Sequence, residues 1–180
     1  IASKFYRAPL YPEANKQHRI AVFFPAYKED KVIIDSVRSF LGQDYPKELY
    51  DVYVISDHMQ DSTNETLSQL PIRLLTATYE DSSKAKALLL AINAIEEEGK
   101  AGGLRDRQLA LMYDIAVVMD ADNVTVPGFL SEVNRAYCTG VWSMQAHRTG
   151  KNLNTDIALL DGVSEEINNG FFRSGHNALG

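Results

Sequence analysis

Two carboxylates that lie one residue apart follow a short apolar run. Asp120 and Asp122 come directly after the apolar residues 115–119. Such a run is typical of a strand buried on both faces, and successive side chains of a strand point to opposite faces. We therefore expect the two carboxylates to point to the same side. Two carboxylates in one place suit a hard divalent cation, which proteins often hold with one or two carboxylates and the phosphates of a substrate.

The same residue types also suit simpler structures. Asp and Asn favour turns, so residues 120–123 fit a strand end followed by an Asx turn as well as a metal site. Asp57 is typical of a loop that follows a strand, and Lys84 and Arg148 suit solvated surface positions. The acidic pair alone leaves both interpretations open, and only the arrangement of the whole chain can favour one of them.

Composition and charge exclude several classes of protein. Hydrophobic residues make up 45% of the 180-residue chain and charged residues 23%, which is typical of a globular protein and excludes wholesale disorder. The net charge of -6 and the lack of any Lys/Arg-rich run argue against a nucleic-acid-binding surface. Cys138 is the single cysteine, so an internal disulfide and a Cys-rich metal site are excluded.

The chain has features expected of a fragment. No apolar stretch approaches the ~18 residues that a membrane-spanning helix needs. We therefore expect no transmembrane helix or signal peptide in these residues, and we expect this piece to be soluble. The chain begins with Ile1 and ends at Gly180 without a closing element. We predict that it is a C-terminally incomplete piece of a longer protein.

Alternating strands and helices are predicted after an irregular lead-in. Residues 1–18 show no periodicity, and residues 19–180 form the predicted domain. The predicted strands are residues 20–24, 50–56, 71–77, 115–119 and 141–147. The predicted helices are residues 29–41, 62–69, 84–98, 128–137 and 155–168. This order predicts an α/β fold of the Rossmann-like kind, with a mostly parallel sheet covered by helices on both faces.

Local signals define the ends of these elements. Pro25 is expected to end the first strand, because proline cannot donate to a central ladder. Ser62 and Glu65 have the spacing of a capping box, which predicts a helix that starts at Ser62. Ser82 or Ser83 is expected to cap the next helix. The predicted inner side of that helix consists of Leu88, Leu89, Ala91, Ile92 and Ile95.

Ligands of such sheets bind beyond the carboxyl ends of the strands, at what we call the carboxyl edge. The polar segments predicted to lie there are residues 25–29, 57, 76–80, 120–122 and 145–148. Asp120 and Asp122 would hold a metal that bridges two phosphates of a nucleoside diphosphate. Lys84 would meet a phosphate, and Asp57 would bind a base or ribose. Glycosyl transfer from a sugar nucleotide needs such a site, because a divalent ion stabilises the charge that grows on the departing diphosphate.

Five short motifs together resemble the family 2 glycosyltransferases over about residues 19–180. They are residues 25–29, 56–63, 84–88, 120–123 and the pair Gln145 and Arg148 in a Gln-x-x-Arg spacing. The chain looks most like the membrane-associated, synthase-like members that are related to cellulose and hyaluronan synthases. Each motif is weak alone, and the order and spacing of all five carry the resemblance.

The resemblance implies a GT-A fold, an inverting mechanism, a UDP-sugar or similar donor with Mg or Mn, and a lipid or polysaccharide acceptor. It also implies that the domain faces the cytoplasm beside a membrane in the full-length protein. By similarity, Pro25, Ala26, Tyr27, Glu29 and Asp57 would surround the base and ribose. Lys84 would lie near the nucleotide, and Asp120 and Asp122 would serve the diphosphate and the metal. Gln145 and Arg148 would lie toward the sugar or the acceptor.

Two departures from the family pattern bear on function. Family members often carry a second acid directly after the position of Asp57, where this chain has His58. The family's catalytic base is an acid downstream of the metal motif, followed in synthases by a Gln-x-x-Arg-Trp motif that this chain lacks. The acids that follow Asp122 are Glu132, Asp156, Asp161, Glu165 and Glu166, none of them in a matching context. We therefore predict that the base lies beyond residue 180 and that this chain binds a donor but transfers its sugar poorly or not at all.

Other classes of protein remain as alternatives. A sugar-nucleotide pyrophosphorylase would carry a Gly-rich, basic loop after the first strand, where this chain has residues 25–29. A non-catalytic, transferase-like binding module fits the missing base, although the intact Asp-x-Asp pair argues against it. A Rossmann dehydrogenase is disfavoured, because no Gly-x-Gly-x-x-Gly follows any predicted strand.

Overall fold

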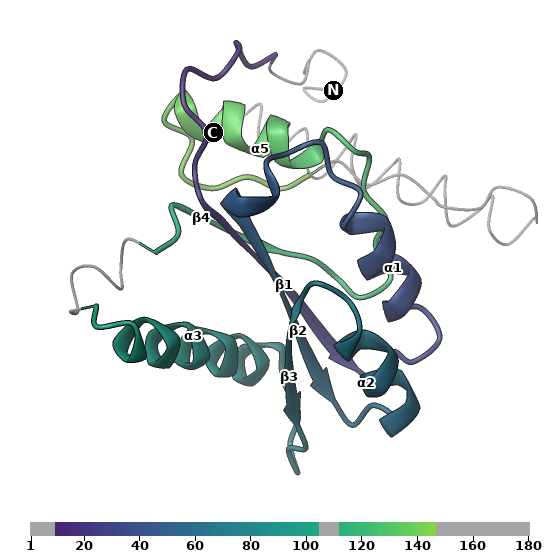
Figure 1. The fold of residues 1–180 in the computed structure, drawn as a ribbon. Helices are drawn as coiled ribbons and strands as arrows, with labels where there is room; N and C mark the ends of the chain where they lie inside the picture. The colour runs from purple at the N-terminus through teal and green to yellow at the C-terminus, as the bar shows by residue number, and fades with distance from the viewer. Residues whose placement is uncertain (1–9, 105–111, 147–180) are drawn as a thin grey trace, which may run out of the picture. The chain divides into compact units, whose positions relative to one another are not determined.

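The structure is a computed structural model that describes residues 10–104 and 112–146. The chain divides into two compact units. One is Glu13–Gly140, and the other consists of Ile1–Pro12 and Val141–Gly180, of which residues 10–12 and 141–146 are described. The sheet and its helices belong to Glu13–Gly140 (Figure 1).

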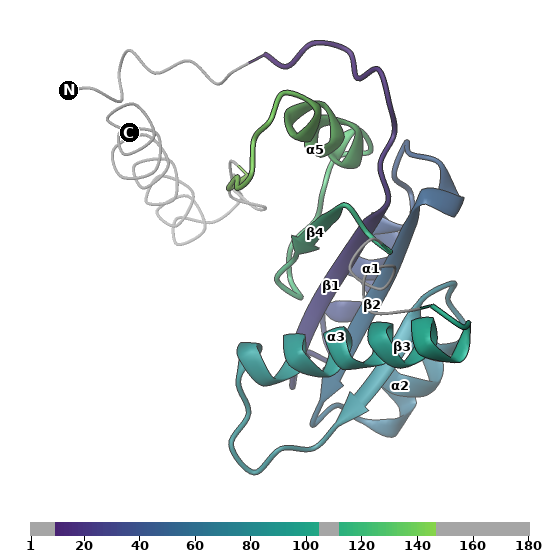
Figure 2. The ribbon, with the colours of Figure 1, turned by 90° about the vertical axis from the view of Figure 1, so that its left-hand side faces the viewer.

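Four parallel strands form the sheet, in the order β3-β2-β1-β4. They are β1 (Ile20–Tyr27), β2 (Tyr50–Asp57), β3 (Arg73–Ala77) and β4 (Ile115–Val118). The helices are α1 (Ile33–Phe40), α2 (Asp61–Ser68), α3 (Lys84–Ala101) and α5 (Phe129–Cys138), with a short 3-10 turn η2 (Lys47–Leu49). Figures 1 and 2 show α3 across one face of the sheet, with α1 and α2 on the other face. The predicted α/β architecture is confirmed.

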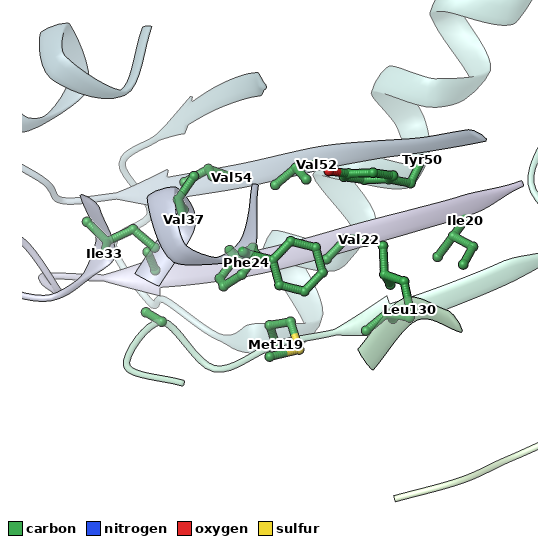
Figure 3. Close-up of a cluster of buried hydrophobic side chains, with 14 of the residues drawn as sticks. Ile20, Val22, Phe24, Ile33, Val37, Tyr50, Val52, Val54, Met119 and Leu130 are labelled. Atoms are coloured by element: carbon green, nitrogen blue, oxygen red, sulfur yellow. The ribbon is translucent and has the colours of Figure 1, made fainter. Parts of the chain in front are cut away.

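The central strand β1 sends its side chains into two apolar layers. Ile20, Val22 and Phe24 lie in a cluster with side chains from α1 and α5 (Figure 3), and Leu67 of α2 belongs to the same cluster. Ala21 and Phe23 lie in a second cluster, which α3 completes. Because both faces of β1 are buried, its sequence is a continuous apolar run rather than an alternating one. This packing gives β1 a fixed position from which its last residues reach the carboxyl edge.

Pro25 does not end β1, which continues to Tyr27. The Met119 N–H donates to the Phe23 carbonyl (2.8 Å), so the backbone groups of Phe23 face β4, and those of Pro25, two residues on, face the same way. The β4 ladder ends where Phe23 pairs with Val118. The nitrogen of Pro25 therefore lies beyond the last pair of that ladder, where a missing N–H costs no sheet hydrogen bond.

The inner side of α3 differs from the prediction. Ala87 and Ala91 are the residues of the apolar stretch that are buried against the sheet, whereas Leu89 and Ile92 are exposed. Leu88 and Ile95 are partly buried, as packed neighbours of the second cluster. Residues 87–92 are all apolar, so hydrophobic spacing alone could not select the buried face. Small alanines four residues apart bring the helix close to the sheet.

The end of the lead-in is tied to the domain. The Asn134 side-chain amide donates to the Lys16 carbonyl (2.8 Å), and its oxygen accepts from the His18 N–H (3.1 Å). The Tyr45 hydroxyl also accepts from the His18 N–H (2.9 Å) and donates to the His18 carbonyl (2.8 Å). Asn134 is buried in α5, so these hydrogen bonds hold residues 16–18 against the helix without regular secondary structure.

Two predicted elements of the second unit have different outcomes. Residues 141–146 form neither helix nor strand, so the strand predicted over residues 141–147 is wrong for its described part. The apolar content that favoured a strand there includes Trp142, which is almost fully exposed. The helix predicted over residues 155–168 lies outside the described residues. Within the part of the chain that the structure describes, no helix combines the length and apolarity needed to cross a membrane.

Candidate functional site

The parallel register brings the ends of three strands side by side. Tyr27, Asp57 and Ala77 are register partners and are the last residues of β1, β2 and β3. β4 ends earlier, at Val118, which pairs with Phe23. The loops that follow the four strands therefore all leave at the carboxyl edge, as the sequence predicted from the order of elements.

Hydrogen bonds fasten the loop after β1 to the loop after β2. The Lys28 N–H donates to the Asp57 carbonyl (3.2 Å), and the Glu29 N–H contacts the sulfur of Met59 (3.1 Å). Lys28 and His58 both have a φ of 55°, in the left-handed region that a residue with a Cβ rarely adopts. Such strained residues concentrate at functional sites, which favours a binding site at these two loops.

Asp57 is a buried carboxylate at the carboxyl edge, with 3% of its surface exposed. Its Oδ1 lies 2.6 Å from His58 Nδ1 and accepts from the Tyr79 N–H (3.4 Å). Burial acts to raise the pKa of this carboxyl, but hydrogen bonds from Ser82, His58 and Tyr79 outweigh burial, and the pKa lies below its usual value. Asp57 is therefore an ionised acceptor at neutral pH, surrounded by groups from the loops after β2 and β3.

His58 connects this carboxylate to Tyr27. The His58 and Tyr27 rings meet edge to face, with centroids 5.6 Å apart, and half of Tyr27 is exposed. An exposed aromatic ring beside a hydrogen-bonding carboxylate is suited to stacking on a nucleobase. The sequence analysis predicted donor-binding roles for Tyr27 and Asp57. It noted His58 only because family members often carry an acid at that position. No spacing rule indicates that an imidazole will turn back onto the preceding residue.

The start of α2 is held by Asp30 rather than by a capping box. Asp30 Oδ1 accepts from the Gln60 N–H (2.9 Å) and from the Thr63 hydroxyl (2.7 Å). Ser62 lies inside the helix, which begins at Asp61, and the helix start has no side-chain cap of its own. The prediction of a capping box from Ser62 and Glu65 is therefore wrong, because a residue from the loop after β1 supplies the acceptor instead.

Replacing Asp30 by alanine is expected to lower the free energy of unfolding at pH 7 by about 1 kcal/mol, the typical cost of a lost helix cap. Hydrogen bonds from Thr63 and Gln60 hold the pKa of Asp30 below its usual value. A carboxyl of this kind stabilises the fold above its unfolded pKa of about 4, and that contribution is lost as the pH falls through the folded pKa. Urea unfolding should therefore show a difference from the wild type that shrinks below pH 4. Glu97→Ala on the exposed side of α3 is the control, with a change within about 0.5 kcal/mol.

The acidic pair lies in a turn beyond β4. β4 ends at Val118, and the Asn123 N–H donates to the Asp120 carbonyl (3.0 Å), which closes a turn over residues 120–123. Asp122 is therefore not part of a strand. The prediction that strand geometry points Asp120 and Asp122 to the same side is wrong. Asp120 is partly exposed and Asp122 is exposed. The backbone follows the turn interpretation, and a turn can still present both carboxylates to a ligand.

Lys84 and Asp120 form an ion pair. Lys84 is the first residue of α3, and the Ser83 hydroxyl caps that helix by accepting from the Lys86 N–H (3.2 Å). Of the two capping serines considered from the sequence, Ser83 is thus the one whose side chain caps the helix. The structure brings the predicted phosphate-binding cation into contact with a predicted metal ligand from a different element. Both side chains are accessible, with exposures of 54% for Lys84 and 40% for Asp120.

Gln43 positions the segment that follows the acidic turn. Its side-chain amide donates to the Thr125 hydroxyl (3.0 Å) and the Val126 carbonyl (2.8 Å), and its oxygen accepts from the Leu130 N–H (3.1 Å). Gln43 is buried, and the Asp44 N–H adds a bond to the Pro127 carbonyl (2.7 Å). These contacts tie residues 125–130 to the loop after α1. Sequence reasoning missed Gln43, because a polar residue after a helix has no pattern that marks it as buried.

The donor set suits a metal that is shared with a nucleotide. In the two described stretches, residues 10–104 and 112–146, no group of three or more His, Cys, Asp or Glu side chains could hold a metal ion. Asp120 and Asp122 supply at most two carboxylates, which is the number that commonly holds Mg²⁺ together with substrate phosphates. The residues therefore fit a metal held jointly with a diphosphate, and they do not form a protein-only metal centre.

The other predicted donor-binding residues have mixed positions. Pro25 and Ala26 belong to β1, where the Ala26 side chain is buried in the core, so only its backbone is available to a ligand at the edge. Glu29 is exposed in the loop after β1. Gln145 is exposed in the second unit, and Arg148 lies outside the described residues. The roles of all five stay predictions.

Solved structures with a similar fold include a mannosyltransferase. The mannosyltransferase PcManGT from Pyrobaculum calidifontis, in complex with GDP-Man and Mn2+, matches with a TM-score of 0.53 and 19% identity over 74% of this chain and 36% of that chain. S. aureus TarS 1-349 in complex with UDP matches with a TM-score of 0.50 and 17% identity over 77% of this chain and 43% of that chain. This chain thus spans less than half the length of either protein. These likenesses show a GT-A, Rossmann-like α/β fold.

Residues 18–155 match the family model described as Glycosyltransferase like family 2. Because the match covers most of the chain, the chain belongs to this glycosyltransferase family. No curated protein matches the chain. The predicted family and fold are confirmed, and the predicted subgroup is not distinguished by these comparisons.

Proposed function

We propose that this chain is the donor-binding part of an inverting glycosyltransferase that uses a nucleotide-sugar, most simply a UDP-hexose, together with Mn²⁺ or Mg²⁺. The observation that carries the proposal is the contact between Lys84 and Asp120 at the carboxyl edge, the same edge at which β2 ends with Asp57. The segment of residues 79–84 connects the two, because the Tyr79 N–H donates to Asp57 Oδ1 (3.4 Å) and Lys84 pairs with Asp120. A short segment of six residues thus contacts both the proposed base-binding carboxylate and the proposed metal-binding carboxylate.

Each group has a distinct task in this proposal. The Tyr27 ring stacks on the base, while Asp57, aligned by His58, accepts a hydrogen bond from the base or ribose. Asp120 and Asp122 would hold a divalent ion, which would supply positive charge to stabilise the departing diphosphate. Lys84 contributes a positive charge beside the same phosphates. Gln43 keeps the segment after the acidic turn in place.

The acceptor side and the cellular setting extend the proposal by resemblance. We place the chain with the synthase-like members, which transfer to a lipid or a saccharide beside a membrane, with this domain on the cytoplasmic side. The catalytic base is proposed to lie beyond residue 180. Glu132, a described acid after Asp122, pairs with Arg135 on α5, so it is engaged within its own helix. We therefore expect donor binding without efficient transfer.

Calorimetric titration of the chain with UDP tests this proposal. With Mn²⁺ present the chain should bind UDP at least thirty-fold more tightly than with a chelator, because the two carboxylates otherwise repel the diphosphate. Transfer from a UDP-sugar to water or to a saccharide should be slow in the same sample. Binding that is equal with and without metal would contradict the proposal.

Two alternative functions are separated from the proposed one by the reactions that they predict rather than by UDP binding alone. A non-catalytic binding module would bind UDP with metal but show no transfer even when the chain is extended beyond residue 180. A sugar-nucleotide pyrophosphorylase would consume a sugar phosphate and a nucleoside triphosphate. The loop at residues 25–29, without a Gly-rich basic sequence, argues against that class.

A further inference from the structure

The Lys84 side chain lies where a positive charge is needed when no nucleotide is bound. Its ammonium group contacts Asp120 Oδ1, although the two residues are 36 positions apart in the chain and belong to different elements. Asp120 is one of two carboxylates within a single turn, and closely spaced negative charges repel each other unless a cation lies between or beside them. The lysine supplies that cation from the protein itself.

Local sequence does not account for a lysine at this position. The first turn of a helix favours negative side chains, since the helix dipole is positive there. The first turn of α3 carries no acidic residue, and it begins with Lys84. The charge is therefore unfavourable for α3 taken alone. The contact with Asp120 is a favourable interaction of Lys84 that the helix itself does not supply.

We propose that Lys84 is a placeholder cation, which neutralises Asp120 in the nucleotide-free protein and leaves it when a metal-nucleotide complex binds. This inference rests on the proposed donor-binding function. Lys84 then carries its charge from Asp120 to the diphosphate, while Asp120 becomes a metal ligand. Lys84 thereby lowers the affinity of the site for the metal alone and couples the binding of the metal to the binding of the nucleotide.

The exposure of the pair makes the exchange feasible. Both side chains are about half accessible, so the ammonium group can move without breaking any core packing. Ion pairs of this exposure contribute little in water, and they weaken a competing interaction by only about two- to five-fold. A placeholder of this strength lowers the affinity for free metal without blocking the site.

Replacing Lys84 by methionine tests the exchange, because methionine keeps much of the side-chain length and removes the charge. Binding of Mn²⁺ is measured by electron paramagnetic resonance, first without nucleotide and then with UDP. Without nucleotide, the variant should bind Mn²⁺ about two- to five-fold more tightly than the wild type. With UDP, it should bind the nucleotide about ten-fold more weakly, because the diphosphate loses one cation.

Lys100→Met is the matched control. Lys100 lies near the other end of α3 and pairs with Glu96, so its loss changes the net charge of the chain equally but leaves Asp120 untouched. Neither Mn²⁺ nor UDP binding should change in this variant. Thermal unfolding of both variants within about 2 °C of the wild type would confirm that the fold is retained.

The outcomes separate this inference from the proposed function. If the wild type fails to bind UDP with Mn²⁺, the proposed function is wrong. If the wild type binds both, but Lys84→Met leaves nucleotide-free Mn²⁺ binding unchanged or weaker, the placeholder role is wrong and the function stands. Equal tightening in Lys84→Met and Lys100→Met would also overturn the placeholder role, since it would trace the effect to overall charge.

Discussion

Replacing Asp120 by asparagine is expected to lower the affinity for UDP in the presence of Mn²⁺ by at least thirty-fold, or about 2 kcal/mol. The amide has nearly the same shape as the carboxylate but carries no charge, so it cannot neutralise a divalent ion. With only Asp122 left, the described turn offers the metal one carboxylate. The variant should therefore lose the dependence of UDP affinity on Mn²⁺, as measured by calorimetry with Mn²⁺ and with a chelator.

Asp114→Asn is the control variant, because it removes the same charge as Asp120→Asn and also lies next to β4. Asp114 lies just before β4, at the opposite end of the strand from Asp120, and accepts from the Arg19 N–H (3.0 Å). Asparagine retains an acceptor oxygen for that bond, so the strand should stay in place and UDP binding should not change. If both variants lose affinity equally, net charge rather than metal coordination would explain the effect. If Asp120→Asn binds UDP as the wild type does, the acidic pair is not the metal site.

The sequence predicted the sheet and its carboxyl edge because both depend on strong, local signals. Buried parallel strands are continuous apolar runs, and residues 20–24 carry that signal clearly. Residues 115–119 carry it too, but Ala116 and Val118 of the edge strand β4 are exposed, so the predicted burial on both faces is wrong for β4. The order of strands and helices then restricts the topology, since parallel strands need crossover connections of one hand. The ends of β1, β2 and β3 consequently meet where the sequence placed them.

The sequence did not predict features that depend on contacts between distant segments. Asp30 caps α2 from another loop, Gln43 holds the segment after the acidic turn, and Lys84 pairs with Asp120. None of these contacts follows from spacing, because each joins residues that are 30 or more positions apart. The length of β1 was also underestimated, since the tolerance for Pro25 depends on where a neighbouring strand ends. Tertiary context decides these features, so single-sequence patterns cannot.

The packing of β1, whose last residues lie at the carboxyl edge, depends on the side chain of Phe24. Phe24 is fully buried in β1 (Figure 3), and its ring meets the Phe40 ring edge to face, with centroids 5.4 Å apart. Its cluster includes Ile33 and Val37 of α1 and Met119 beyond β4. The side chain thus packs between the helix layer and the strands, three residues before Tyr27.

Replacing Phe24 by alanine is therefore expected to lower the free energy of unfolding by about 3–5 kcal/mol, from lost transfer energy and from the cavity that remains. Urea unfolding measures the change, and the slope of the transition should stay near that of the wild type. Leu89→Ala is the control on the exposed side of α3, with an expected loss within about 0.5 kcal/mol. A domain of this size commonly has 5–15 kcal/mol of stability, so Phe24→Ala should still fold at 25 °C and bind UDP in its folded fraction. A loss below about 1 kcal/mol would mean that the layers around β1 collapse onto the cavity, and that the carboxyl edge does not depend on this packing.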